Sequence, residues 1–363
     1  MSGGVDSSVA AALLVAQGYD VVGMMLRLWS EPGQSAHNRC CTPDQMARAR
    51  QVADQLGIPF YAIDAQDFFR QRIVQFYLDE SLAGRTPNPC LECNRAIRFT
   101  FLLNHALALD ADYLATGHYA RLRRTARGYE LHQAADSAKD QSYVLHVLGQ
   151  AQLARVLFPI GDYTKPQVRQ LAQEFELPVA FQSESMDLCF LGHTSGGDFL
   201  RRHAEHTPAP GPILDAAGTQ LGAHTGLPFY TIGQRKGLGL SSPEPLFVIA
   251  KDVARNALIV GLRAELGRTS LRVRQVNWMA DQPPDGPLRA EVKVRYKSPA
   301  APALITPLPG QAALVVFDEP AVGIAPGQGA VFYQGAHCLG GGLIADEAGQ
   351  TPPPGSVHLT TSL

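Results

Sequence analysis

The first eight residues of the chain, MSGGVDSS, constrain its fold more than any other stretch. An apolar run with helical spacing, Val9 to Gln17, follows them directly. Gly3 and Gly4 let backbone N–H groups approach an anion closely, and the positive end of the following helix points to the same place. The serine hydroxyls add donors, and Asp6 is placed to hold the Mg²⁺ ion that accompanies a nucleotide. The stretch predicts a phosphate-binding loop, and a serine-rich helix N-cap is the plainer alternative.

This loop differs from the two commonest nucleotide-binding motifs. It lacks the Gly-Lys-Ser/Thr ending of a Walker loop and the Gly-x-Gly-x-x-Gly spacing of a dinucleotide fingerprint. The segment SGGVDSS instead resembles the PP-loop of the ATP pyrophosphatases. Those enzymes transfer AMP to an oxygen atom of their substrate, release pyrophosphate, and let a nucleophile displace the AMP. The resemblance implies that ATP is a substrate.

Length and charge limit the function classes. The chain has 363 residues, enough for two or three domains with their own cores. Its net charge of −2 excludes a globally basic nucleic-acid binder but allows a local basic face. No apolar run is long enough to span a membrane, and Met1 leads straight into the glycines without a signal peptide. We therefore expect a cytoplasmic location.

Helix and strand signals alternate after the loop. Residues 19–28 and 58–64 read as buried strands, and residues 113–118 as a third strand that ends in glycine and histidine. A helix between the first two begins with Thr42-Pro43-Asp44-Gln45, a capping box with proline at the first helical position, and ends near Gly57. A further helix is expected over residues 99–109. This alternation predicts a doubly wound parallel sheet with ligands at the carboxyl ends of its strands.

The start of the sequence departs from this pattern. A phosphate loop of this type should follow a buried strand, but the sequence places no residues before Met1. We expect that the central strand is missing because the translation start was assigned late; an incomplete protein is the alternative. In-frame upstream codons that spell a short Val/Ile/Ala run would support the late start.

Four of the six cysteines lie in two close pairs, and Cys189 and Cys338 stand alone. Cys90 and Cys93 form a Cys-x-x-Cys in a segment, residues 84–94, that two prolines should keep as a surface loop, with a helix from about Arg95. Thiols near a helix N-terminus have lowered pKa values, so we expect reactive or cluster-binding cysteines. A structural zinc half-site is the alternative, but the sequence has no second Cys-x-x-Cys or His pair to complete it. Cys40 and Cys41 are adjacent, and Cys338 is expected to be an inert strand residue.

Five motifs in order carry a closer resemblance. They are the PP-loop, TPNPCLECN at 86–94, ATGHYA at 115–120, KDQSY at 139–143 and CFLG at 189–192. Together they resemble the tRNA-specific 2-thiouridylases, and the likeness extends over the whole chain apart from the first strand. The resemblance implies an ATP- and Mg²⁺-dependent tRNA-uridine 2-sulfurtransferase. It would adenylate the C2 oxygen of the wobble uridine, U34, and then transfer sulfur from a cysteine persulfide or a cluster-bound sulfur. Its partners would be tRNAs of the Lys, Glu and Gln type and a persulfide donor such as a cysteine desulfurase or sulfur-relay protein.

The resemblance also assigns residues. Cys93 matches the nucleophile and Cys189 the cysteine that receives persulfide sulfur. The nucleotide would be bound by Met1, Ser2, Gly3, Gly4, Val5, Asp6, Ser7, Ser8, Leu26 and Gly117. The tRNA would be contacted by Asn88, Pro89, Cys90, His118, Lys139, Asp140, Gln141, Arg235, Lys236, Arg295, Tyr296 and Gln328.

Several of these residues have plainer explanations. His118 could simply satisfy the end of a strand, and Lys139 with Asp140 could be a solvated pair. The arginines of residues 121–127 suit contacts with the phosphate backbone, or an ordinary solvated hairpin.

The composition changes near Pro208 from helical periodicity to short alternating strands rich in proline and glycine. Residues 230–239 place Arg235 and Lys236 among glycines, which fits a loop that grips RNA phosphates. Alternating runs near 271–276, 290–296 and 313–317 predict a small antiparallel barrel. We expect a PP-loop catalytic domain over residues 1–204, a central β-rich tRNA-binding domain over 205–268 and a C-terminal β-barrel over 269–363.

The chemistry of sulfur transfer stays open. Many thiouridylases have aspartate at the position of Cys90, so this chain offers three thiols, Cys90, Cys93 and Cys189. Two of them suffice for a persulfide relay, whereas three thiolates could hold a [4Fe–4S] cluster with one open iron. A PP-loop amide ligase, which needs no loop cysteines, and a non-catalytic tRNA-binding protein are the competing functions.

Overall fold

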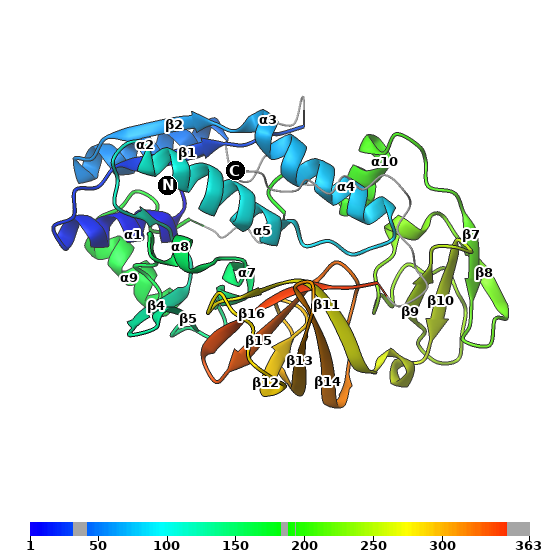
Figure 1. Cartoon of the computed structure of the whole chain (residues 1–363). Coiled ribbons are helices and arrows are strands. Elements are labelled where there is room, and N and C mark those ends of the chain that lie inside the picture. Colours follow the sequence, from blue (N-terminus) through cyan, green and yellow to red (C-terminus); the bar gives the residue numbers. More distant parts are fainter. Residues whose placement is uncertain (32–41, 183–187, 193, 347–363) are drawn as a thin grey trace.

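The computed structural model describes residues 1–31, 42–182, 188–192 and 194–346. Figure 1 shows an N-terminal α/β region, a barrel beneath it and a small β-rich region at one end. Thus the α/β class, the central β-rich region and the C-terminal barrel that the sequence predicts are confirmed. Cys40 and Cys41 lie outside the described residues.

The N-terminal region alternates helices with parallel strands. β1 (Gly23–Arg27) pairs with β2 (Phe60–Asp64) in parallel, and β3 (Leu114–Ala115) pairs with β6 (Val156–Leu157) in the same sense. In the described part of the chain these are two separate pairs. The idea that the sequence lacks a strand before Met1 stays a prediction. The helices and turns of this region are α1 (Val5–Ala16), α2 (Pro43–Leu56), α3 (Gln66–Phe69), η2 (Arg70–Val74), α4 (Gln75–Leu82), α7 (Ser142–Leu145), α8 (Gln150–Leu153) and α9 (Lys165–Glu174).

Local signals placed α2 correctly. Thr42 Oγ1 accepts a hydrogen bond from the Gln45 N–H at 3.2 Å, and the Gln45 side chain accepts one from the Thr42 N–H at 3.0 Å. Pro43 occupies the first helical position, and Gly57 ends the helix in the left-handed region at φ 66°. The expected capping box is therefore confirmed.

The segment around Cys90 corrects a prediction. The expected loop over residues 84–94 ends earlier, because α5 (Pro89–Glu92) already begins a continuous helical segment with η3 (Cys93–Leu102) and α6 (Leu103–Leu107). A proline at the first helical position costs nothing, since the N–H that it lacks has no partner inside the helix. Asn88 caps this end by accepting a hydrogen bond from the Cys90 N–H at 3.1 Å. Cys90 and Cys93 thus lie on a helix.

The central region is a four-stranded sheet in the order β8-β7-β10-β9. Its small core includes Ile213, Val248, Leu258 and Val260, and Leu227 covers it. The region consists of α10 (Gly196–His203), β7 (Gly211–Leu214), β8 (Gln220–His224), η4 (Leu227–Phe229), β9 (Phe247–Asp252), β10 (Ala257–Gly261) and η5 (Arg263–Leu266).

The C-terminal barrel is antiparallel and closed, because β11 pairs with both β14 and β16. Inward residues such as Val273, Ile305 and Phe332 fill it. Its strands are β11 (Arg268–Trp278), β12 (Leu288–Lys293), β13 (Ala301–Leu308), β14 (Ala312–Ala321), β15 (Gly329–Gln334) and β16 (His337–Ile344).

A hairpin from the N-terminal region extends the sheet of the barrel. β4 (Ala120–Thr125) and β5 (Gly128–Gln133) form this hairpin, and β5 pairs with the start of β16 through Leu131 opposite Cys338. Both of these residues are fully buried. Burial raises the pKa of the Cys338 thiol to about 12, so Cys338 is the inert strand residue that the sequence predicts. The N-terminal region and the barrel are joined by this pairing.

No helix among the described residues is long and apolar enough to cross a membrane.

We predict that Leu131→Ala lowers the free energy of unfolding by about 2–5 kcal/mol, because the cavity forms where the hairpin meets the barrel. Urea denaturation followed by circular dichroism measures the change. Arg124→Ala on the exposed end of the same hairpin is the matched control, with an expected effect within about 0.5 kcal/mol. Equal effects of the two substitutions would contradict this account of the junction.

Candidate functional site

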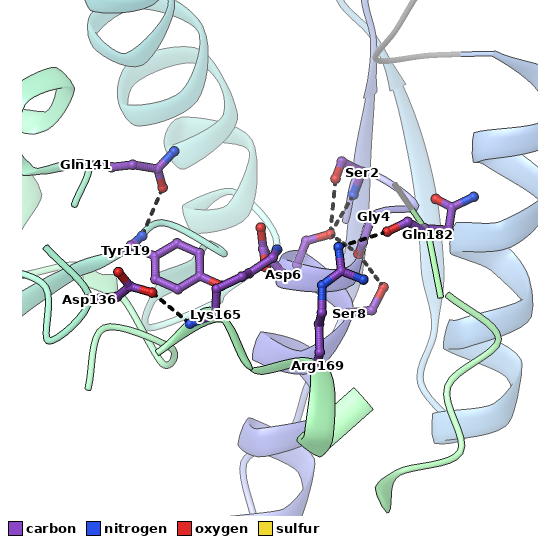
Figure 2. A network of polar contacts seen from close by, with 11 residues as sticks. Ser2, Gly4, Asp6, Ser8, Tyr119, Asp136, Gln141, Lys165, Arg169 and Gln182 are labelled. Carbon is purple, nitrogen blue, oxygen red and sulfur yellow. Dashed lines mark hydrogen bonds and ion pairs between the residues drawn. The ribbon is translucent and has the colours of Figure 1, made fainter. Parts of the chain in front are cut away.

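The phosphate-binding loop is a tight backbone turn at the start of α1. Gly3 has φ +71°, and a Cβ atom there would collide with the Gln45 carbonyl oxygen, so only glycine fits. Ser7 Oγ accepts a hydrogen bond from the Ser2 N–H at 3.0 Å, which folds the loop over the helix end (Figure 2). Ser8 is fully buried and donates to the Gly4 carbonyl at 2.9 Å, so its hydroxyl supports the loop from inside. Val5 packs in the core, and Ser2, Gly4 and Ser7 form the accessible wall.

Two further predicted nucleotide residues lie at the carboxyl ends of strands. Gly117 follows β3 and presses against the loop, since a Cβ atom there would lie 2.7 Å from the Ser7 nitrogen. Leu26 is in β1 and packs against the cluster that contains Phe69. The structure therefore brings Gly117 directly to the loop and places Leu26 on the adjoining strand pair.

The carboxylate of Asp6 is held by two side chains. Its Oδ1 accepts hydrogen bonds from Lys165 Nζ at 2.6 Å and from the Tyr119 hydroxyl at 2.9 Å. The Lys165 side chain is buried, whereas a third of the Asp6 side chain is exposed. One accessible carboxylate together with substrate phosphates is what a nucleotide-bound Mg²⁺ usually takes from a protein. Asp6 therefore fits the predicted magnesium role.

Two cations on α9 near the loop were not identified from the sequence. Lys165 begins α9, and Arg169 follows one turn later; Figure 2 shows both side chains reaching from this helix toward the loop. Arg169 donates to the Gln182 carbonyl at 3.3 Å. The Gln182 amide, oriented to satisfy both of its polar atoms, accepts from Arg48 Nε at 3.0 Å and donates to the Gly3 carbonyl at 3.3 Å. The only local signal was two cations four residues apart after a helix cap.

Two of the three candidate cysteines pack on one apolar cluster. Cys90 is exposed on the first turn of α5, whereas Cys93 and Cys189 are half-buried and pack on the cluster that contains Phe69 and Phe190. Within the described residues no group of three or more His, Cys, Asp or Glu side chains could hold a metal ion. Cys93 and Cys189 thus share a common apolar cluster, and the iron–sulfur cluster stays a prediction.

His118 is buried and neutral. Its Nε2 lies 3.3 Å from Arg98 Nη1 and its Nδ1 lies 2.8 Å from the Thr116 hydroxyl. Because an arginine can only donate, Nε2 must accept and Nδ1 carries the proton. Burial, and then the charge of Arg98, hold the pKa of His118 well below its usual value. These contacts agree with the plainer expectation that His118 forms hydrogen bonds at the end of a strand. The predicted contact of His118 with tRNA stays untested.

The KDQSY motif is largely internal. The buried Asp140 carboxylate accepts from the N–H groups of Ala134 and Ser142 and from the Ser142 hydroxyl. Gln141 accepts a hydrogen bond from the Tyr119 N–H at 2.9 Å, and Tyr119 in turn contacts Asp6. Lys139 is half-buried. Asp140 therefore holds its own turn, Gln141 supports the nucleotide loop through Tyr119, and the predicted tRNA contacts of this motif stay untested.

The candidate tRNA residues of the barrel connect regions of the chain. Arg295 donates to the carbonyls of Gly323 and Ile232, both at 2.7 Å, which ties the barrel to the loop that carries the exposed Arg235 and Lys236. Gln328 donates to the Thr86 carbonyl at 2.8 Å, just before α5. The ring of Tyr296 meets Tyr143 edge to face at 6.1 Å. Asn88 and Pro89 form the start of α5 beside these contacts.

Comparisons with known families cover nearly the whole chain. The model described as "tRNA methyl transferase HUP domain" matches residues 1–193, "tRNA methyl transferase PRC-barrel domain" matches 197–262, and "Aminomethyltransferase beta-barrel domain" matches 268–344. These ranges run close to the three expected domains, whose boundaries stay a prediction.

Curated relatives are similar over their full length. The tRNA-specific 2-thiouridylase MnmA of Magnetococcus marinus is 47% identical over 95% of this chain and 97% of the relative. The proteins of the same name from Roseiflexus castenholzii and Moorella thermoacetica are 47% and 46% identical over 95% and 96% of this chain and 98% and 99% of the relatives. Among solved structures, NMN synthetase from Francisella tularensis matches 51% of this chain and 64% of that chain at 18% identity with a TM-score of 0.31.

We predict that the stability contributed by neutral His118 is lost in acid. Its folded pKa is lowered, so the unfolded state binds the extra proton first and the free energy of unfolding falls as the pH drops below about 6.5. His118→Gln should be less stable than the wild type at pH 7.5, and its deficit should shrink toward pH 5. Denaturation across this range measures it, with the exposed His105→Gln as control. A deficit independent of pH would contradict the assignment.

Proposed function

Because the chain belongs to the tRNA-specific 2-thiouridylase family, we propose that it activates the wobble uridine of tRNA with ATP and replaces the C2 oxygen with sulfur. One observation carries this proposal. The chain combines a phosphate-binding loop closed by Gly117 with two cysteines, Cys93 and Cys189, that share one apolar cluster. An amide ligase of the same superfamily would use the loop but has no need of the two thiols.

The first step is adenylation. The C2 oxygen of the uracil attacks the α-phosphorus of ATP, the bond to the bridging oxygen breaks, and pyrophosphate leaves with the electron pair while the N3 proton is lost. Backbone N–H groups of the loop around Gly3 and Gly4, together with the Ser7 hydroxyl, bind the phosphates. Asp6 would hold the Mg²⁺ ion, which offsets phosphate charge. Oxygen becomes a good leaving group only after this step.

The second step is sulfur transfer by a two-cysteine relay. Cys189 carries a persulfide received from a donor protein, and its terminal sulfur attacks C2, so AMP leaves with the C–O electron pair. The Cys93 thiolate then attacks Cys189 Sγ, which breaks the S–S bond, releases the 2-thiouridine and forms a Cys93–Cys189 disulfide. Two electrons from an external thiol restore both cysteines. Such chemistry suits a reducing cytoplasm.

A [4Fe–4S] cluster on Cys90, Cys93 and Cys189 is the alternative that the sequence left open. The described residues do not form a metal-binding group, so no step of this proposal uses a cluster. The exposed position of Cys90 on α5 instead suits contact with the target base, beside Asn88 and Pro89.

The tRNA would be bound by shape across all three regions. The wobble base must leave the anticodon stack to reach a site between the loop and α5. Arg235 and Lys236 would grip backbone phosphates from the central region, and Arg295 would hold their loop against the barrel. We expect the substrates to be tRNAs of the Lys, Glu and Gln type.

We predict that Cys93→Ser and Cys189→Ser each abolish 2-thiouridine formation while tRNA-dependent pyrophosphate release continues, because adenylation precedes the use of sulfur. Nucleoside mass spectrometry of the tRNA and a pyrophosphate assay measure the two steps. Cys90→Ala in the iron-free protein should retain thiolation from a persulfide donor.

Anaerobic reconstitution of the protein with iron and sulfide tests the cluster against the two-cysteine relay. About four irons and four sulfides per chain, with broad visible absorbance that Cys90→Ala removes, would replace the relay by the cluster. Unchanged 2-thiouridine in a strain that lacks the gene would overturn the proposed function itself.

We also predict that Arg235→Ala with Lys236→Ala weakens tRNA binding and lowers the slope of log affinity against log salt concentration by about one to two, because two phosphate contacts are lost. Filter binding at several salt concentrations measures the slope. ATP binding should not change. Arg255→Ala, an exposed arginine of the same region that is paired with Asp252, is the control. An unchanged slope in the double variant would show that this loop does not contact phosphates.

A further inference from the structure

The phosphate-binding loop has no cation of its own. Residues 1–8 contain neither lysine nor arginine, whereas the lysine of a Walker loop lies within the motif and reaches the β- and γ-phosphates. Backbone N–H groups and one helix end supply only partial charges. A triphosphate at this loop therefore needs cations from elsewhere in the fold.

Lys165 is placed to be one of them. It is far from the loop in sequence, yet its Nζ lies 2.6 Å from Asp6 Oδ1 and 5.8 Å from the centre of the Tyr119 ring. Its backbone is fixed, because its N–H donates to Asp136 Oδ2 at 2.9 Å and Thr164 caps α9 through Gln167. Burying a lysine is costly unless its charge is compensated, and here the compensating group is the carboxylate expected to take Mg²⁺.

Arg169 provides the second cation. Residues four apart on a helix share a face, so Arg169 follows Lys165 toward the loop, as Figure 2 shows. Arg169 donates to the backbone carbonyl of Gln182 at 3.3 Å, and the side chain of Gln182 in turn contacts the Gly3 carbonyl of the loop. Arg48, on α2, donates to the side-chain amide oxygen of Gln182. The guanidinium of Arg169 has the planar donor geometry that suits a phosphate.

We propose that Lys165 and Arg169 bind the β- and γ-phosphates of ATP and hold the pyrophosphate as it leaves. This inference rests on the proposed function, since it concerns the same nucleotide site. In the absence of nucleotide, Asp6 keeps the ammonium of Lys165 beside the loop. When Mg–ATP binds, the Asp6 carboxylate would turn to the metal and the Lys165 ammonium to the phosphates. Each of the two charged groups would then exchange the other for a partner on the nucleotide.

The two cations then act where charge develops. As the bond between the α-phosphorus and the bridging oxygen breaks, the electron pair moves onto the pyrophosphate. Cations already fixed on α9 stabilise that charge without rearranging. Neither residue contacts the uracil or the sulfur, so both are specific to the leaving group. AMP, which lacks these phosphates, should not depend on them.

The test measures ligand binding to the free protein. Lys165→Gln and Arg169→Gln should each weaken ATP and pyrophosphate binding by about 10- to 100-fold, the size of a lost charge-assisted hydrogen bond, while AMP affinity changes less than about 2-fold. Isothermal titration calorimetry with ATP, pyrophosphate and AMP, each with Mg²⁺, measures all three affinities. Gln170→Ala, an exposed residue of the same helix, is the matched control.

The outcomes are distinct. Equal losses for AMP and pyrophosphate, or unchanged pyrophosphate binding, would show that Lys165 only forms a structural ion pair, and the proposal would fail. Arg169→Gln keeps the test decisive if Lys165→Gln does not fold. A wild-type protein that binds pyrophosphate through these residues but does not thiolate tRNA would overturn the proposed function and leave this inference intact.

Discussion

The backbone of Gly117 lies so close to the phosphate-binding loop that no side chain fits between them. A Cβ atom at this position would lie 2.7 Å from the Asp6 carbonyl carbon and the Ser7 nitrogen. The loop is thus held on one side by α2, which touches Gly3, and on the other by the segment after β3. The conformation that presents N–H groups to an anion is built before any nucleotide arrives, which reduces the ordering cost of binding.

From Gly117 the chain continues directly into the contact between the N-terminal region and the barrel. Tyr119 donates to Asp6, Gln141 holds the Tyr119 backbone, and residue 120 begins the hairpin that extends the barrel sheet. Next to Gln141, the buried Ser142 and Tyr333 hydroxyls, 3.1 Å apart, join the start of α7 to β15. The nucleotide loop and the barrel are therefore connected through a few residues of two short segments, 117–120 and 141–142.

The sequence predicted the parts of the fold that depend on local pattern. The capping box of α2, the parallel pairing and the alternating strands of the barrel all follow from residue spacing. The predicted helix start near Arg95 was wrong, because α5 begins at Pro89. A proline can either break a helix or begin one, and the Asn88 cap shows that Pro89 begins this helix. The pair Asp6 and Lys165 could not be predicted, since a contact across so much sequence depends on packing. The buried Asp140 likewise has the appearance of a surface motif until its donors are known.

One edge of β16 pairs with two different strands. His337 and Cys338 pair with the hairpin strand β5, and residues from Gly340 onward pair with β11 and close the barrel. Gly340 permits the change of partner, because a Cβ atom there would collide with the Asn277 carbonyl. The pairing of β16 with β15 shifts register at the same place, because Phe332 lies opposite Gly340 and Tyr333 opposite Cys338, which leaves Leu339 as an extra residue in β16. Side chains alternate along a regular strand, and an extra residue interrupts that alternation. The change of partner therefore coincides with a bulge, so the half of β16 that pairs with the hairpin and the half that closes the barrel each have their own register.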